Sequence, residues 1–401
     1  MGTRASLLSG LSVLDLTGFL AGPYGSMILG DMGAAVTKVE PVMGDNTRGL
    51  GPYEFGGDSA YFLSINRNKQ SISVDLKSAG GRSVIERLIR GSDVVLDNLR
   101  QRQREQLGLG YERIQQLNPQ AISCSVTGFG SDGPYQDRAA YDMIVQALSG
   151  VMSLTGDEEG RSVRAGVPIG DLVAGMYVVI GVLGALEERH HSGHGQHIDI
   201  AMLDSQVSML TYLASYYLIG GVVSGRQGRG HVSIPTYNSF ATKDGIDLVV
   251  CANTEEMWMS LCRVLRRSDL IDDAKFRTNS DRLAHKEELI PILRAEIVDW
   301  PMDALYSALL EAGVPAAPIQ TIAEVINDPQ VLERDMVVTV PHRSGGTFDS
   351  LGSPIKCSRS VGGSFLPPPG HGEHTEAVLR EIGFLDDEIV ELVRSGAVLT
   401  N

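Results

Sequence analysis

Residues 11–40 read LSVLDLTGFLAGPYGSMILGDMGAAVTKVE, a stretch that opens with a short apolar segment at 11–16 and closes with another at 35–40. Both segments are rich in β-branched residues and have the length of strands. Helical patterns occur later at 79–90 and 102–117. Three more strand-like segments lie at 71–76, 93–96 and 121–126. This alternation predicts an α/β fold with a mostly parallel sheet covered by helices, in which ligands bind beyond the carboxyl ends of the strands.

The chain changes in character after about residue 219. Five glycines fall between residues 220 and 230, which indicates a flexible loop or a domain boundary. A more mixed segment follows it, with a strand near 247–252 and several helices. Before the glycine run we expect a strand near 196–201 and helices at about 140–153, 172–190 and 203–219. Helices at 373–382 and 386–395 are expected near the end of the sequence.

Composition limits the classes of partner. The 401 residues include 34 Lys and Arg against 49 Asp and Glu, a net charge of −15, which argues against nucleic acid or an anionic membrane as the main partner. The apolar stretch 172–186 is short for a membrane span, and 205–225 carries many hydroxyl groups, so we expect no membrane either. Four cysteines without a C-x-x-C pair fit a reducing, cytoplasmic location.

Two further patterns have both a functional and a structural interpretation. Residues 128–133 match the G-x-G-x-x-G dinucleotide loop, but Pro134 follows instead of a helix, so we favour a turn that could still line a ligand site. His190, His191, His194 and His197 could suggest a metal site, but no Cys or carboxylate lies between them. We therefore expect a polar turn after a helix, and no metal.

Asp171 stands in the segment VPIGDLVAGM (167–176), directly before the long apolar helical pattern. The structural interpretation is an N-cap, because Asp accepts hydrogen bonds from the first free N–H groups of a helix. The functional interpretation is a carboxylate that attacks a substrate covalently and is kept ionised by the helix N-terminus. Spacing alone favours the N-cap.

Several stretches taken together resemble the family III CoA-transferases, which include the formyl-CoA:oxalate and carnitine CoA-transferases. They keep their order along nearly the whole chain and include the IGDLVAGM turn around Asp171. The matching stretches are 13–41, 66–77, 96–100, 127–150, 169–176, 192–204 and 372–383.

The resemblance implies a doubly wound, Rossmann-like large domain made of residues 1–225 and 333–401. A smaller α+β domain, residues 226–332, would be inserted into it. Two chains would interlock as linked rings in a homodimer. The substrates would be an acyl-CoA and a free carboxylic acid, for which a short dicarboxylate such as succinate is the candidate, with no tightly bound cofactor.

The resemblance also assigns roles to residues. Asp171 corresponds to the catalytic aspartate, which forms an anhydride with the acyl group and then a thioester with CoA. Apart from the resemblance, we consider Arg48 and His231 candidates for binding the distal carboxylate of a dicarboxylic acid. The positions expected to bind substrate or CoA are Leu20, Ala21, Val74, Lys77, Asn98, Leu99, Arg100, Arg104, Arg138, Ala139, Tyr141 and Asp142. Leu20 replaces a glutamine of the formyl-CoA transferases, Gln106 an arginine and Ala139 a basic residue, which argues against specificity for formyl-CoA and oxalate.

Two alternatives differ from a transferase. The same superfamily contains α-methylacyl-CoA racemases, in which a histidine before an aspartate removes the α-proton. Tyr141 takes the place of that histidine here, so the base is missing. The second alternative is a non-catalytic CoA-binding subunit in which Asp171 only caps its helix.

Overall fold

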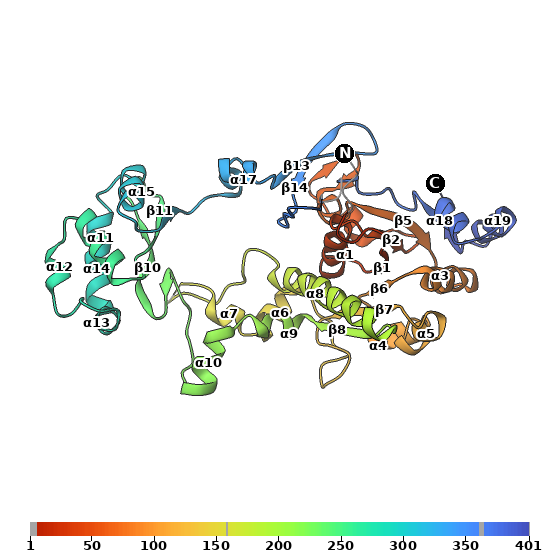
Figure 1. Cartoon of the computed structure of the whole chain (residues 1–401), viewed down its shortest axis with the longest axis horizontal. Coiled ribbons are helices and arrows are strands. Elements are labelled where there is room, and N and C mark those ends of the chain that lie inside the picture. The colour runs from red at the N-terminus through yellow and green to blue at the C-terminus, as the bar shows by residue number, and fades with distance from the viewer. Residues whose placement is uncertain (1–5, 158, 361–364, 401) are drawn as a thin grey trace. The chain divides into compact units, whose positions relative to one another are not determined.

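The computed structural model describes residues 6–157, 159–360 and 365–400 (Figure 1). The chain forms two compact units. The first consists of Met1–Val151, Arg164–Tyr212 and Pro329–Asn401, and the second of Met152–Val163 and Leu213–Asp328. The predicted division is into a large domain, 1–225 with 333–401, and a small domain, 226–332. Compact units in one structure do not test whether these parts are separate domains, so the division remains a prediction.

A seven-stranded sheet forms the centre of the first unit, in the order β15-β5-β2-β1-β6-β7-β8. All neighbours are parallel except β15, which pairs antiparallel with β5. The strands are β1 (Ser12–Leu16), β2 (Ala35–Glu40), β5 (Lys69–Val74), β6 (Val94–Asp97), β7 (Ile122–Thr127), β8 (His197–Ala201) and β15 (Val398–Leu399). The predicted α/β class with a mostly parallel sheet is confirmed.

Helices cover both faces of this sheet. Adjacent residues of β1 belong to different apolar clusters, because successive side chains of a strand point to opposite faces. Val13 packs in a cluster with Leu29 and Val178, and Leu14 in a cluster with Ile85. The first cluster includes α1 (Ala21–Asp31) and α8 (Ile169–Ser192). The second includes α3 (Ala79–Gly91), α5 (Tyr111–Leu117), α18 (Thr375–Glu381) and α19 (Asp386–Arg394).

Shorter elements complete the first unit. They are η1 (Asn46–Gly49), α2 (Ala60–Ile65), α4 (Gln101–Gln106), α6 (Asp142–Leu148), α9 (Met202–Ser208), α17 (Pro329–Glu333) and the hairpins β3–β4 (Glu54–Phe55, Asp58–Ser59) and β13–β14 (Val337–Pro341, Thr347–Leu351). The single helix predicted at 102–117 is two helices, α4 and α5. They are separated by Gly108, whose φ of +70° lies in the left-handed region, and by Gly110 before α5.

Helix α8 is long and apolar enough to cross a membrane by length and composition, although the sequence suggested a shorter apolar stretch. In the first unit it packs against α1, α9, β7 and β8. The buried core helix of a soluble protein meets the same criteria. Its other side leaves Ile180 62% exposed and Met176 45% exposed.

The second unit is built on an antiparallel sheet in the order β12-β11-β10-β9. Its core includes Phe240 of β10 and Trp258 of α11. The strands are β9 (Gly230–His231), β10 (Ile234–Ala241), β11 (Asp247–Cys251) and β12 (Ala316–Pro318). The helices are α11 (Glu255–Val264), α12 (Asp269–Asp272), α13 (Asn279–Ala284), α14 (Lys286–Ile297), α15 (Met302–Glu311) and α16 (Ile322–Val325). Helices α7 (Val151–Leu154) and α10 (Thr211–Gly220) begin in the first unit and continue into the second.

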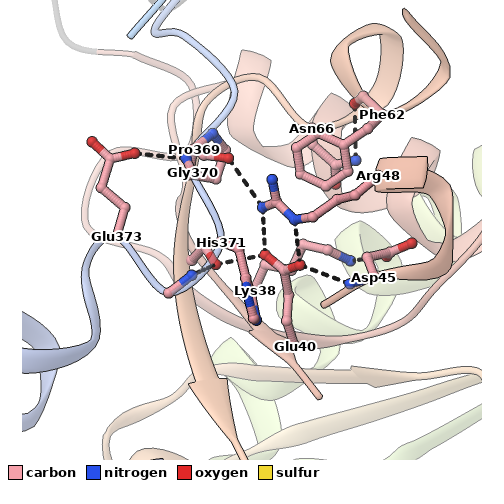
Figure 2. Close-up of polar contacts among 12 residues, drawn as sticks. Lys38, Glu40, Asp45, Arg48, Phe62, Asn66, Pro369, Gly370, His371 and Glu373 are labelled. Carbon is pink, nitrogen blue, oxygen red and sulfur yellow. Dashed lines mark hydrogen bonds and ion pairs between the residues drawn. The ribbon is translucent and has the colours of Figure 1, made fainter. Parts of the chain in front are cut away.

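A buried ion pair joins distant segments of the first unit (Figure 2). The Arg48 guanidinium donates to both carboxylate oxygens of Glu40 at 2.7 Å, and also to the Pro369 carbonyl at 3.0 Å. Its carbon lies 3.8 Å from the centre of the Phe62 ring. Burial opposes ionisation of Glu40, but Arg48 outweighs it and lowers the pKa of the carboxyl. The pair therefore holds the returning C-terminal segment against β2.

Arg48→Met is expected to lower the free energy of unfolding by about 3–5 kcal/mol, because it leaves the Glu40 charge buried without its ion-pair partner. Urea unfolding followed by circular dichroism measures the change. In a matched control, Arg394→Met removes the exposed Arg394–Glu391 pair and should change stability by less than about 0.5 kcal/mol. The double variant Glu40→Gln/Arg48→Met should be more stable than Arg48→Met. Equal loss in the double variant would contradict the charge-based explanation.

Candidate active site

A cavity of about 500 Å³ lies in the first unit, where the chain leaves β1, β6 and β7 at their carboxyl ends. This is the edge of a parallel sheet at which ligands are expected to bind. Asp171 lines the cavity together with residues of several other segments of the first unit. The lining residues are Gly18, Phe19, Leu20, Ala21, Tyr61, Asn98, Arg100, Val126, Thr127, Gly128, Gln136, Arg138, Ala139, Ala140, Tyr141, Asp142, Met143, Arg164, Pro168, Asp171 and Met202.

Asp171 lies within the first turn of α8 and is not its N-cap. The N-cap residue is Pro168, which has no side chain able to cap. The capping interpretation favoured by the spacing is therefore wrong. The carboxylate of Asp142 takes the capping part instead, because its Oδ1 accepts from the Gly170 N–H at 2.8 Å. The Asp171 carboxylate is left facing the cavity.

A chain of hydrogen bonds fixes the segment that carries Asp171. The buried amide of Gln146 donates to Asp142 Oδ2 at 2.7 Å and accepts from the Ala165 N–H at 2.8 Å. Glycine suits position 170, because a Cβ at Gly170 would overlap the side-chain amide of Gln206. Helix α6 thus holds residues on both sides of the turn that leads into α8.

Helices α1 and α8 approach closely beside the carboxylate. A Cβ at Gly175 would lie 2.6 Å from the Ala21 carbonyl oxygen, so only glycine allows this approach. The Ala21 N–H, at the start of α1, donates to the Asp171 carboxylate. This N–H has no partner within its own helix, so it is available to stabilise negative charge.

The electrostatics of the cavity favour a protonated Asp171 near neutral pH. Burial is the main cause and the nearby Asp142 charge the second, and together they raise the pKa of Asp171 to about 7. The bond from Ala21 acts in the opposite direction. Burial and the charge of Asp171 also raise the pKa of Tyr61 to about 12, so its hydroxyl remains a donor. Proton release at Asp171 would therefore occur within the physiological range.

Buried polar contacts shape the turn after β1, which forms another wall of the cavity. Asp15 accepts from the Thr17 N–H at 2.9 Å, and Lys38 Nζ donates to the Thr17 carbonyl at 2.8 Å. Asn98 accepts from the Gly18 N–H at 3.1 Å and donates to the Gly18 carbonyl at 2.8 Å. The ends of β1 and β6 are thereby held together.

The cavity contains most of the residues predicted from the sequence. Nine of them line it: Leu20, Ala21, Asn98, Arg100, Arg138, Ala139, Tyr141, Asp142 and Asp171. Tyr141 packs edge-on against Phe19, with the ring centres 5.9 Å apart. Asp142 is placed here, but its hydrogen bonds go to the start of α8 and to Gln146, so it positions protein groups and needs no CoA contact to explain it.

Four predicted residues do not line this cavity. The Val74 side chain is 1% exposed within the sheet, and Leu99 packs against an apolar cluster. The Arg104 guanidinium is buried and lies 3.3 Å from Asp97, so this side chain serves a structural ion pair. Lys77 is exposed and follows the carboxyl end of β5. Contact of Lys77 with a remote part of CoA remains a prediction.

Arg48 and His231 are also not at this cavity. The Arg48 guanidinium is occupied by Glu40 and Pro369, which argues against the predicted role in binding a substrate carboxylate. His231 lies in β9 of the second unit. Tyr61 and Arg164 also line the cavity, and neither was predicted from the sequence as a site residue. Tyr61 gives no local signal, because only the fold brings it near Asp171. Arg164 offered one, as a cation seven residues before Asp171.

The two remaining motifs form turns. Gly130 and Gly133 have φ of +86° and +80°, and the next helix, α6, begins only at Asp142, which agrees with the turn interpretation of residues 128–133. His190 and His191 lie in the last turn of α8, which ends at Gly193 with φ of +75°. Both side chains place a ring nitrogen within 3.6 Å of Glu187.

Comparison with known proteins gives consistent matches. The profile of CoA-transferase family III matches residues 8–375. Succinyl-CoA:glutarate CoA-transferase of Mus musculus is 40% identical over 394 residues, covering 98% of this chain and 90% of that protein. Succinate–glutarate CoA-transferase of Agrobacterium fabrum (strain C58) is 39% identical, with coverage of 95% and 97%. The crystal structure of a CAIB/BAIF family protein from Brucella suis has a TM-score of 0.85 and 36% identity, covering 94% of this chain and all of that one.

These matches extend along nearly the whole chain, and two of them are to transferases of about 40% identity. The protein therefore belongs to CoA-transferase family III and is an enzyme that moves CoA from an acyl-CoA donor to a carboxylic acid.

Proposed function

We propose that this transferase acts on short dicarboxylic acids and that Asp171 carries CoA between donor and acceptor. The observation that carries the proposal is an Asp171 carboxylate that faces the cavity and is not needed for helix capping. Three relatives, which transfer CoA between succinate and glutarate or mesaconate according to their names, support the substrate class.

The proposed reaction has four steps. An Asp171 carboxylate oxygen attacks the thioester carbonyl of the donor, the C–S bond breaks, and the CoA thiolate leaves a mixed anhydride. The thiolate attacks the aspartyl carbonyl carbon, releasing the donor acid as a carboxylate and leaving an aspartyl-CoA thioester. The acceptor carboxylate attacks this thioester and displaces the thiolate. The thiolate then attacks the acyl carbonyl of the acceptor, which restores the Asp171 carboxylate and gives the new acyl-CoA.

This scheme needs no net proton transfer, but it does need an ionised nucleophile. The Ala21 N–H favours the carboxylate form of Asp171, whereas burial and Asp142 oppose it. The same N–H, at the start of α1, is suitably placed to stabilise the oxyanion that forms when the aspartyl carbonyl is attacked. The protonated Tyr61 hydroxyl is a second donor in the cavity.

The proposal includes a homodimer of interlocked chains. Exposed apolar side chains lie on α6, on α8, and on or directly after α9. Exposed apolar side chains of this kind are typical of an interface between proteins. They are Met143, Ile144, Leu148, Met176, Ile180, Val207 and Met209. We further propose a cytoplasmic location, supported by four free cysteines, and acyl-CoA as a substrate with no tightly bound cofactor and no membrane partner.

Asp171→Ala is expected to lower the transfer rate by at least about a thousandfold, because the covalent route is lost. Transfer is measured by mass spectrometry with a panel of acyl-CoA donors and free acids. Circular dichroism and binding of free CoA serve as controls for folding and should change little. Near-normal transfer by this variant would show that the covalent scheme is wrong.

The wild-type enzyme incubated with an acyl-CoA should form a hydroxylamine-sensitive adduct on the peptide that contains Asp171. A non-catalytic CoA-binding subunit would form none. A racemase would instead exchange the α-hydrogen of its substrate in deuterated water, and we expect no such exchange.

The rate at subsaturating acyl-CoA is expected to rise with pH, with a midpoint near 7, because Asp171 attacks only as a carboxylate. Asp142→Asn removes the neighbouring negative charge and so lowers the pKa of Asp171. The rising limb of the pH profile should therefore move to lower pH. The amide oxygen of the substituted side chain can still accept the bond from Gly170, but its NH2 group cannot accept the bond that Gln146 donates to Oδ2. Circular dichroism and binding of free CoA to Asp142→Asn therefore serve as controls for positioning. An unchanged limb would rule out Asp142 as a cause of the raised pKa.

Sedimentation of the wild-type protein at micromolar concentration should give twice the mass of one chain. Ile180→Glu places a charge on the exposed apolar side of α8 and should weaken association. Leu385→Glu, at a side chain that is 71% exposed before α19, is the control and should leave association unchanged. A monomeric wild-type protein would contradict the proposed dimer.

A further inference from the structure

We infer that Arg164 selects dicarboxylic acids by binding the carboxylate that does not react. This inference rests on the proposed function, because it assigns a role within the Asp171 cavity. It differs from the sequence-based candidates, Arg48 and His231.

Arg164 is the cation on the same chain segment as the proposed nucleophile. It lines the cavity with Pro168 and Asp171, which follow it in the sequence. Its side chain makes a 3.4 Å hydrogen bond to the carbonyl of Gly166 in its own turn. Among residues 6–157, 159–360 and 365–400, no Asp or Glu pairs with it. The exposed guanidinium is therefore available to an anion from solution.

The backbone beside Arg164 is fixed relative to the nucleophile. The Ala165 N–H donates to Gln146, Gln146 donates to Asp142, and Asp142 accepts from the Gly170 N–H. These three bonds connect the residue after Arg164 with the residue before Asp171 through one buried glutamine. When the distance between a cation and a nucleophile is fixed, the site favours dicarboxylic acids whose two carboxylates are that far apart.

The carboxylates of the cavity would repel a second substrate carboxylate unless a cation lies close to it. Asp142 and Asp171 already place two carboxylates there. A dicarboxylic acid adds a second negative charge beyond the one that reacts, and that charge must be balanced where water is partly excluded. A guanidinium suits this purpose because it binds a carboxylate through two parallel hydrogen bonds.

The other two arginines of the cavity, Arg100 and Arg138, lie on other segments of the chain. The Arg138 guanidinium lies 3.6 Å from the centre of the Tyr135 ring. Arg100 is the N-cap residue of α4, after β6. Neither lies on the segment that leads to Asp171, so each is better placed for the phosphates of CoA than for the short acid.

The test compares glutarate with valerate, which have the same chain length but differ by the distal carboxylate. In turnover with a fixed succinyl-CoA concentration, the wild type should prefer glutarate in kcat/KM. Arg164→Gln should reduce this preference by about tenfold or more, mainly through KM for glutarate, since a charged hydrogen bond is lost. Arg164→Lys keeps the positive charge but cannot make two parallel hydrogen bonds to a carboxylate. Its preference for glutarate should lie between those of the wild type and Arg164→Gln.

Binding of free CoA, which has no distal carboxylate, provides the matched control. Calorimetry should show an unchanged Kd for CoA in Arg164→Gln and a raised Kd in Arg138→Gln. If Arg164→Gln instead weakens CoA binding and keeps the preference for glutarate, Arg164 contacts phosphate and the inference is overturned. An unchanged preference with unchanged CoA binding overturns it as well.

A direct binding experiment separates this inference from the proposed function. Glutarate and valerate are titrated into Asp171→Asn and into Asp171→Asn/Arg164→Gln, neither of which needs to turn over. The second variant should bind glutarate about tenfold more weakly and valerate equally. Equal glutarate binding overturns the role of Arg164 even if transfer occurs. Failure of the wild type to transfer CoA to any acid overturns the proposed function even if the binding difference is found.

Discussion

The hydrogen bond from the Gly170 N–H to the Asp142 carboxylate determines what the rest of the cavity can do. It satisfies the start of α8 from outside the helix, so Asp171 two positions into that helix keeps its oxygens for the cavity. An aspartate that capped its own helix would have its carboxylate committed to backbone N–H groups. The same bond ties α6 to α8, and through Gln146 it also fixes the backbone at Ala165. One capping interaction therefore sets the positions of Asp171, the proposed nucleophile, of Asp142 and of the chain that bears Arg164.

Burial of Asp171 beside Asp142 destabilises the folded state when Asp171 is ionised. The pKa of Asp171 is raised from 3.8 to about 7, so the folded protein holds that proton more tightly than the unfolded chain does. Its contribution to stability therefore falls as pH rises from about 4 to about 7. Glu40 behaves in the opposite way: its pKa is lowered, and its pair with Arg48 stabilises the fold at neutral pH and weakens in acid. Ion pairs away from the cavity thus support a fold whose proposed catalytic carboxylate is unfavourably placed.

The sequence predicted the architecture of the first unit well because strand and helix signals are local. The strands β1, β2, β5, β6, β7 and β8 and helix α8 lie close to their predicted positions. Charge pairing is not local, and nothing in the pattern around Arg48 indicated that Glu40 would occupy its guanidinium. Asp142 was predicted as a residue that binds substrate or CoA and lines the cavity, but its hydrogen bond to Gly170 was not foreseen, because it spans 28 residues. Tyr61 was missed for the same reason, since its place in the cavity depends on how α2 packs against η1, β4 and α1. Contacts that depend on tertiary packing leave no periodic trace in the sequence.

Net charge is a poor guide to an anion-binding site, and the distribution of arginines explains why. Arg48 and Arg67 are held in buried ion pairs with Glu40 and Asp31 and do not line the cavity. Arg100, Arg138 and Arg164 line the cavity, and no ion pair joins them to any carboxylate in the part of the chain that the structure describes. A protein with a charge of −15 can therefore present a locally cationic cavity to a polyanionic thioester and a dianionic acid. The acid excess elsewhere does not cancel this attraction, because exposed charges more than about 10 Å away are largely screened by salt. The positive charge that a cavity offers to an anion therefore depends on which of its arginines the fold pairs with carboxylates, and not on the net charge of the chain.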